Sequence, residues 1–199
     1  MLYLKRFFLL VLVYVILPAC GQQSVVHVRE FKIYTNTQDP ELKETVEQLV
    51  NQYNSDMGGE VLVIVDSPEE ANSSINFSKG MLSSEHRLGH GQWTTQTENK
   101  QAGIIEKSLN SEEVIINYSM HMTFDLDNFR SKAQGRFQAF STNWRHLYHL
   151  FCHEVGHGLQ MDHNNQEDDV MFAKISQNSR SDLDYESYFA RARTFFTQP

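Results

Sequence analysis

The chain has few of the residues that mark several special classes of protein. Two cysteines in 199 residues cannot supply a disulfide-rich scaffold. With 17 Lys and Arg against 25 Asp and Glu, the charge balance argues against a nucleic-acid partner, which needs basic residues to neutralise phosphates. No internal repeat or low-complexity tract is present. Hydrophobic residues make up 40% and aromatic residues 12%, which argues against disorder and favours a compact globular domain.

The long hydrophobic run of the chain lies at the N-terminus. Residues 7–17 carry no charge and follow Lys5 and Arg6, as in a signal peptide. The run is too short for a membrane-spanning helix, which needs about 20 residues. It ends in the sequence Leu-Pro-Ala-Cys at residues 17–20, which resembles a bacterial lipobox. The sequence thus predicts a signal peptide over residues 1–19.

The lipobox implies where the mature protein is held. Cys20 would become a lipidated first residue, so that acyl chains anchor the exported protein in the bacterial cell envelope. Gly21, and not Asp, follows this cysteine, which implies sorting to the outer membrane where a cell has two membranes. The alternative is ordinary secretion with a coincidental cysteine. We expect a lipidated N-terminus and short tether over residues 20–30, followed by one domain over residues 31–199.

Apolar spacing along the mature chain predicts both strands and helices. Residues 31–35 alternate as a strand does, and a helix is expected from Pro40 until Gly58. Residues 61–65 form a β-branched run typical of a buried parallel strand, so this opening indicates a parallel crossover. Further elements are expected as strands at 74–77, 90–95 and 114–118, a loop at 123–142, a helix at 144–161 and a C-terminal helix at 182–196.

The expected helix 144–161 carries a metal-binding pattern. His153 and His157, four residues apart, project from one helix face with the separation that a single Zn²⁺ needs. Glu154 lies about 100° around the helix, where it can reach a water at the metal as a general base. His163, six residues after His157, offers a third ligand. Three histidines leave one coordination position open, which is typical of a catalytic zinc site.

The segment from His153 to His163, followed by Met171, resembles the zinc-binding signature of the metzincin peptidases, closest to their matrixin branch. The resemblance implies that His153, His157 and His163 bind one catalytic Zn²⁺, that Glu154 is the general base, and that Met171 forms a Met-turn beneath the metal. It also implies an α+β fold of α/β-like character. That fold has a twisted, mostly parallel five-stranded sheet with one antiparallel edge strand, a long active-site helix and a C-terminal helix.

Gln160 departs from the family pattern, which has glycine where the active-site helix breaks and the third histidine returns to the metal. A non-glycine residue in a left-handed conformation costs about 1 kcal/mol, which is small against metal-binding energies on the order of 10 kcal/mol. No cysteine lies between residues 20 and 152, so the cysteine switch of matrixin propeptides is absent.

Weaker candidates surround this motif. Leu88 and Gly89 resemble the start of the edge strand that pairs with substrate in matrixins. By the same resemblance His149 lines the S1′ pocket and favours medium-sized or polar substrate side chains, the alternative being a hydrogen-bonded histidine behind that pocket. Asp125 and Asp127 could bind Ca²⁺ or belong to a solvated loop.

Together these residues predict a monomeric zinc-dependent endopeptidase acting on protein or peptide substrates. Two alternatives stay open. A gluzincin-like peptidase would take its third ligand from a downstream acid such as Glu186 instead of His163. A zinc-binding surface lipoprotein would bind peptides or partners without cleaving them, which would leave Glu154 without a function.

Overall fold

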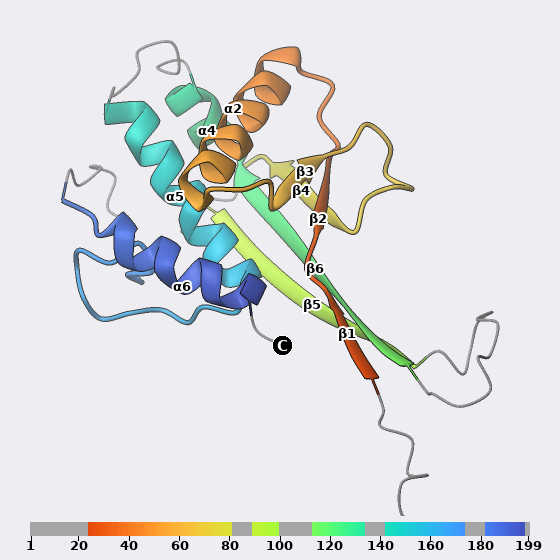
Figure 1. Ribbon diagram of the computed structural model, residues 1–199. Helices are drawn as coiled ribbons and strands as arrows, with labels where there is room; N and C mark the ends of the chain where they lie inside the picture. The colour runs from red at the N-terminus through yellow and green to blue at the C-terminus, as the bar shows by residue number, and fades with distance from the viewer. Residues whose placement is uncertain (1–23, 81–88, 100–112, 134–141, 174–181, 198–199) are drawn as a thin grey trace, which may run out of the picture. The chain divides into compact units, whose positions relative to one another are not determined.

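The computed structural model describes residues 24–80, 89–99, 113–133, 142–173 and 182–197 (Figure 1). The expected signal peptide, Cys20 and Leu88 therefore lie outside the described residues. The chain divides into two compact units, one formed by residues 1–28 and 97–117 and the other by residues 29–96 and 118–199. The candidate metal ligands all belong to the second, larger unit.

In the smaller unit, strand β1 (Ser24–Val28) runs parallel to the first residues of strand β6 (Glu113–Asp125). Ser24 lies opposite Glu113 and Val28 opposite Asn117. β1 falls within residues 20–30, where the sequence predicts a tether. Three of its five residues are valine, and such β-branched residues favour an extended, paired conformation. Part of the expected tether is therefore a strand.

The larger unit is built on four parallel strands. β2 (Phe31–Thr35) lies between β3 (Leu62–Ile64) and β4 (Ser73–Ser78), and β4 pairs with the second part of β6. β5 (Gly89–Asn99) also pairs with β6. Helix α2 (Pro40–Met57) connects β2 to β3, which supplies the crossover that two parallel neighbours need.

The predicted α+β class is confirmed, but the sheet is not the expected one. The described residues form six strands in place of five, and each of the four pairings whose register is described is parallel, so the expected antiparallel edge is not matched. The length of β6 also differs from the prediction, which ends this strand at residue 118. Met120, Met122 and Phe124 continue the alternation and are fully buried. β6 therefore extends to Asp125 and pairs with β4 there, after pairing with β1 at its start.

The predicted loop at 123–142 is wrong for its first half. β6 occupies residues up to Asp125, and helix α4 (Leu126–Ala133) follows at once. The side chain of Asp125 is buried and its Oδ1 accepts a hydrogen bond of 2.8 Å from the backbone N–H of Asn128. A carboxylate that caps a helix in this way stabilises its first turn. One of the two carboxylates considered for Ca²⁺ thus caps α4.

Helix α2 begins and ends where the sequence predicts. Asp39 is the N-cap, with Oδ1 accepting from the Glu41 N–H at 3.0 Å, and Pro40 supplies the first helical position. Gly58 ends the helix in the left-handed conformation at φ 78°. The buried face of α2 consists of Leu42, Thr45, Val46, Leu49, Val50, Tyr53 and Met57.

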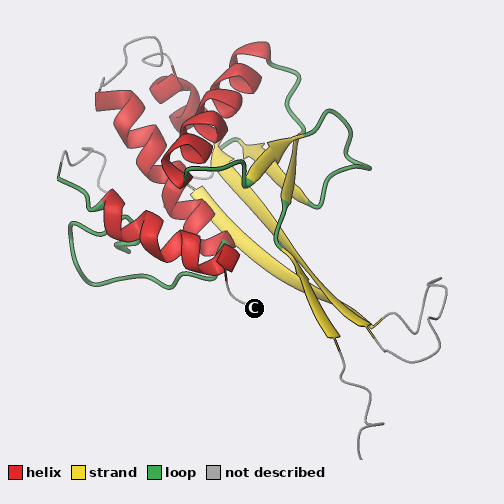
Figure 2. Ribbon diagram, viewed as in Figure 1, coloured by secondary structure: helices red, strands yellow, loops and turns green. Residues whose placement is uncertain are grey.

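The helices of the larger unit gather on one side of its strands (Figure 2). Helix α5 (Thr142–Gly158) and helix α6 (Tyr185–Thr197) complete the set, and both had been expected within a few residues of these bounds. The Tyr53 ring of α2 contacts Phe151 of α5 at 6.0 Å and Phe189 of α6 at 5.3 Å between ring centroids. Because α5 is buried from residue 146 to residue 156, its side chains are held by the core on almost every side.

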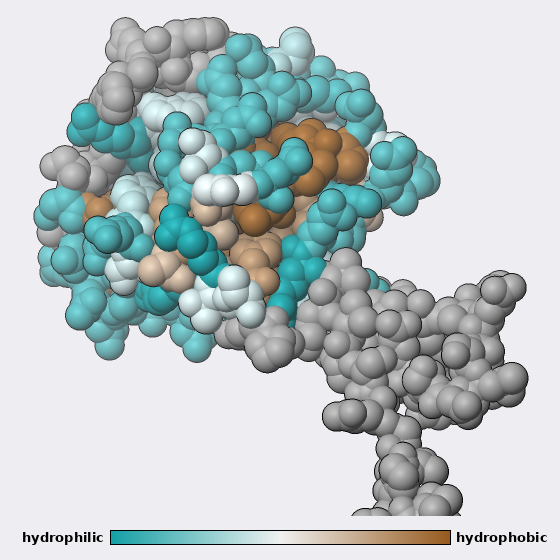
Figure 3. Space-filling view, in the orientation of Figure 1, coloured by the Kyte–Doolittle hydropathy of each residue, from teal (hydrophilic) through white to brown (hydrophobic). Residues whose placement is uncertain are grey.

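The visible surface of the larger unit is mostly hydrophilic, but Figure 3 shows one hydrophobic area in the region where β3 lies in Figure 1. β3 is at the end of the strand order, and Val63 and Ile64 are only partly buried. The sheet therefore ends in a short apolar edge strand.

Helix α5 approaches β6 so closely that a side chain at Gly158 has no space. A Cβ there would lie 2.1 Å from Sδ and 2.6 Å from Cγ of the fully buried Met120. We expect Gly158→Ala to destabilise the protein by about 1–3 kcal/mol, because Met120 must leave its packed position. Thermal unfolding measures this as a fall of about 3–10 °C. Gly59→Ala is the control, since nothing lies within 4 Å of its Cβ, and an equal fall in both variants would contradict the packing argument.

Candidate metal centre

Three histidines lie together at the end of α5. The ring centroids of His153 and His157 are 4.8 Å apart. The ring centroid of His163 lies 5.3 Å from that of His153 and 4.7 Å from that of His157. One nitrogen from each ring lies within 4.8 Å of the other two. Among the described residues, these three side chains form a group that could hold a metal ion. The three ligands expected from the sequence are thus brought together.

The chain reverses directly after α5 and so returns His163 to the helix. Gln160 has φ 62°, which is the left-handed conformation expected for it. The Met161 N–H donates to the Gly156 carbonyl at 2.9 Å, and the Gln160 N–H donates to the His157 carbonyl at 3.0 Å. These two bonds form a Schellman motif, in which a left-handed residue ends the helix. Glutamine therefore adopts the geometry that the family gives to glycine.

Because Gln160 is left-handed, we expect Gln160→Gly to leave the protein as stable as before or slightly more stable. The relief of about 1 kcal/mol of backbone strain offsets the greater freedom of glycine in the unfolded chain. Thermal unfolding checks this result. Gln48→Gly, in the exposed middle of α2, is the matched control and should lower the stability by about 1 kcal/mol. A fall of several degrees for Gln160→Gly would contradict the expectation.

Backbone carbonyls orient two of the three imidazoles. Nδ1 of His153 lies 2.8 Å from the Val170 carbonyl oxygen, and Nδ1 of His157 lies 3.2 Å from that of Met161. Since a carbonyl oxygen can only accept, both Nδ1 atoms carry the hydrogen. In this tautomer Nε2 is the unprotonated nitrogen that would bind a metal, which is the usual arrangement around a protein-bound zinc ion.

Burial keeps His153 neutral. The side chain is 4% exposed, and this desolvation, assisted by the other histidines, lowers its pKa to about 3. Burial also lowers the pKa of His149. At neutral pH both imidazoles are therefore uncharged, and His153 does not have to lose an extra proton before it can bind a metal ion.

The low pKa of His153 predicts how the metal-free protein responds to acid. Between pH 6.5 and about 3 the unfolded chain binds a proton that the folded chain does not. Stability should therefore fall as the pH drops below 6.5, by up to about 1.4 kcal/mol per pH unit from this group. Thermal unfolding of the chelator-treated protein measures the slope. His153→Asn, which keeps a donor for Val170, should show a shallower slope, and equal slopes would contradict the assignment.

Met171 lies directly against the metal-binding helix. It is fully buried, and a Cβ on Gly156 would stand 2.3 Å from its Sδ. The Met171 carbonyl accepts from the Asn164 N–H at 2.8 Å, which ties the turn to the residue after His163. The expected turn methionine thus packs against Gly156, the residue directly before His157, where only a glycine leaves space for it.

Glu154 is not part of the group formed by the three histidines. Its side chain is 4% exposed and is not one of the three that share a metal-sized space. The carboxylate is therefore close to the site in sequence but is not a further ligand. This position agrees with a proton-transfer residue and not with a closed four-ligand site.

The structure places the remaining candidates differently. His149 is 6% exposed, and its Nε2 donates to the Val170 carbonyl at 3.2 Å, as in the alternative of a hydrogen-bonded histidine behind the pocket. Glu186 is exposed in the first turn of α6 and is not in the histidine group. Gly89 is the first residue of β5, as expected for the start of a strand.

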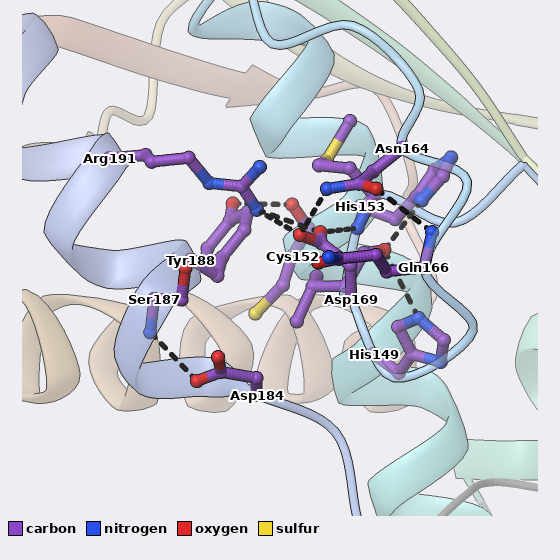
Figure 4. A network of polar contacts seen from close by, with 12 residues as sticks. His149, Cys152, His153, Asn164, Gln166, Asp169, Asp184, Ser187, Tyr188 and Arg191 are labelled. Carbon is purple, nitrogen blue, oxygen red and sulfur yellow. Dashed lines mark hydrogen bonds and ion pairs between the residues drawn. The ribbon is translucent and has the colours of Figure 1, made fainter.

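An ion pair between two charged residues at this centre could not be predicted from the sequence. From the sequence, Asp169 is expected only to shape the turn before Met171, and Arg191 has no expected role. Arg191 Nη2 lies 2.7 and 2.8 Å from the two carboxylate oxygens of Asp169 (Figure 4). An aspartate two residues before the methionine is a turn signal, but nothing local in the sequence links it to a cation 22 residues away.

Neither a family model nor a curated protein matches this chain. In the part of the chain that the structure describes, no helix is both long and apolar enough to cross a membrane.

Proposed function

We propose that the protein is a zinc-dependent endopeptidase. The observation that carries the proposal is the convergence of His153, His157 and His163, three imidazole ligands that no fourth His, Cys, Asp or Glu among the described residues joins. A structural zinc site is normally closed by four protein ligands, whereas a catalytic site keeps one position open. The metzincin-like order of the ligands and of Met171 supports the same interpretation.

The donor set fits zinc. Imidazole nitrogens suit this ion, and two of the three rings already have Nδ1 bound to a carbonyl, so that Nε2 is left for the metal. When bound in such a site, Zn²⁺ supplies Lewis-acid chemistry that polarises a carbonyl and acidifies water. One zinc ion per chain is expected.

Glu154 performs the proton transfers. Its carboxylate takes a proton from the attacking water and later gives it to the amine that leaves when the peptide bond breaks. Its burial keeps bulk water away from the carboxylate, which strengthens each interaction that the group makes. No group of the protein forms a covalent bond with the substrate in this scheme.

The biological setting extends the proposal. The lipobox-like sequence ending at Cys20 supports an exported lipoprotein anchored in the bacterial cell envelope, on the outer membrane where a cell has two. A monomer in that position would act on protein or peptide substrates outside the cytoplasm.

The proposal is tested by hydrolysis of a quenched fluorescent peptide library by the purified protein. We expect cleavage that a chelator abolishes and added Zn²⁺ restores. Binding of about one zinc per chain without cleavage of any library member would instead favour the zinc-binding lipoprotein. Cleavage that persists after the metal has been removed would overturn the metallopeptidase assignment.

A further inference from the structure

Helix α6 reaches the candidate metal centre through an ion pair. Arg191 of α6 donates from Nη2 to both carboxylate oxygens of Asp169, at 2.7 and 2.8 Å. Figure 4 shows the guanidinium extending from α6 to the carboxylate. The Asp169 side chain is 7% exposed and that of Arg191 is 37% exposed. The carboxylate is therefore buried, and Arg191 brings a cation to it from the edge of the site.

The same carboxylate holds the segment that supports two metal ligands. Asp169 Oδ1 accepts from the Met171 N–H at 2.7 Å, and Oδ2 accepts from Nδ2 of Asn164 at 2.8 Å. Asn164 directly follows His163. Both oxygens of Asp169 are thus shared between Arg191 and the backbone or side chains of the turn.

The residue between Asp169 and Met171 provides the second link. Val170 is completely buried, and its carbonyl accepts from Nδ1 of His153 at 2.8 Å. The hydrogen bond from the Met171 N–H to Asp169 Oδ1 joins the two neighbours of Val170 and so holds the Val170 carbonyl in place. A movement of the Asp169 carboxylate therefore displaces the acceptor that orients His153.

We propose that Arg191 is a positioning residue for the metal centre, acting through Asp169 on the first and third histidine ligands. The inference rests on the zinc site of the proposed function. A buried carboxylate needs a cation and hydrogen bonds to stay in place, and residues that support metal ligands from behind affect metal affinity although they never touch the metal. Without the guanidinium, Asp169 is drawn toward water and releases the turn.

Arg193 provides the matched comparison. It lies two residues after Arg191 on α6, and its guanidinium donates from Nε to the Met57 carbonyl at 3.2 Å and from Nη2 to the Asp56 carbonyl at 2.8 Å. These bonds tie α6 to the end of α2, without a contact to the turn before Met171. A purely structural arginine on α6 should therefore behave like Arg193.

The test compares full-length wild type with Arg191→Met and Arg193→Met. Three quantities are measured: the Zn²⁺ affinity by competition with a chromophoric chelator, the visible spectrum of the Co²⁺-loaded protein, and thermal unfolding without metal. We expect Arg191→Met to bind Zn²⁺ about 10- to 100-fold more weakly and to change the Co²⁺ spectrum. Arg193→Met should lower only the unfolding temperature. Equal Zn²⁺ affinities of the two variants would overturn the inference.

A second pair of variants covers the case in which Arg191→Met does not fold. Arg191→Lys keeps the charge, but its ammonium group on a differently shaped side chain does not reproduce the planar guanidinium whose Nη2 contacts both carboxylate oxygens. We expect its Zn²⁺ affinity to lie between those of wild type and Arg191→Met, and below that of Arg193→Lys. Equal affinity of the two lysine variants would refute the positioning role. A wild type without Zn²⁺ affinity would refute the proposed zinc site itself, which separates the two failures.

Discussion

Replacement of Glu154 by glutamine is expected to lower peptide turnover by at least about 100-fold, which is the size of a lost general base. The amide keeps the shape of the side chain but cannot take a proton from water. About one zinc per chain should remain, because Glu154 is outside the group formed by the three histidines. Metal analysis and the rate of cleavage of one identified library peptide provide the two measurements.

Glu167→Gln is the control for this prediction. Glu167 is an exposed acid in the segment between His163 and Met171, and its replacement removes the same charge without touching the helix. The control should retain both zinc and activity. Loss of zinc from Glu154→Gln would show that the carboxylate helps to hold the metal, and the general-base assignment would then fail.

The second large effect is expected from His163→Ala. Removal of one of three ligands should weaken Zn²⁺ binding by at least about 100-fold and abolish the chelator-sensitive activity. The folded metal-free protein should change little, because His163 is exposed. Equilibrium dialysis against buffered Zn²⁺, together with thermal unfolding after chelation, separates these two outcomes.

Glu186→Gln distinguishes this site from the gluzincin-like alternative. Glu186 lies in the first turn of α6 and is not in the histidine group, so its loss should leave zinc binding unchanged. The reverse pattern, in which His163→Ala keeps its zinc and Glu186→Gln loses it, would assign the third ligand to the acid.

Local signals in the sequence predicted the parts of the fold that depend on neighbouring residues. Asp39 and Pro40 begin α2 and Gly58 ends it, because capping bonds join residues only a few positions apart. The spacing of His153 and His157 likewise follows from the period of one helix. The left-handed conformation of Gln160 could be predicted because it depends only on where the helix that carries His153 and His157 ends.

Features set by distant contacts could not be predicted in the same way. β6 continues past residue 118 because Met120 and Met122 are buried in the core, where Met120 packs against Gly158 at the end of α5. The sheet also acquires β1 through pairing with residues almost 90 positions later, a choice that no local pattern specifies. The ion pair of Asp169 with Arg191 could not be predicted for the same reason, since Asp169 alone indicates a turn and Arg191 alone indicates a solvated charge.

The position of Arg191 in α6, after all three histidines in the chain, has a consequence for biosynthesis. The three candidate ligands are present once His163 has been made, but the cation that pairs with Asp169 is added only with α6. A nascent or truncated chain without α6 has all three histidines and an Asp169 that lacks its counter-ion. If Arg191 positions the ligands as proposed, such a chain should bind Zn²⁺ more weakly than a chain that includes α6.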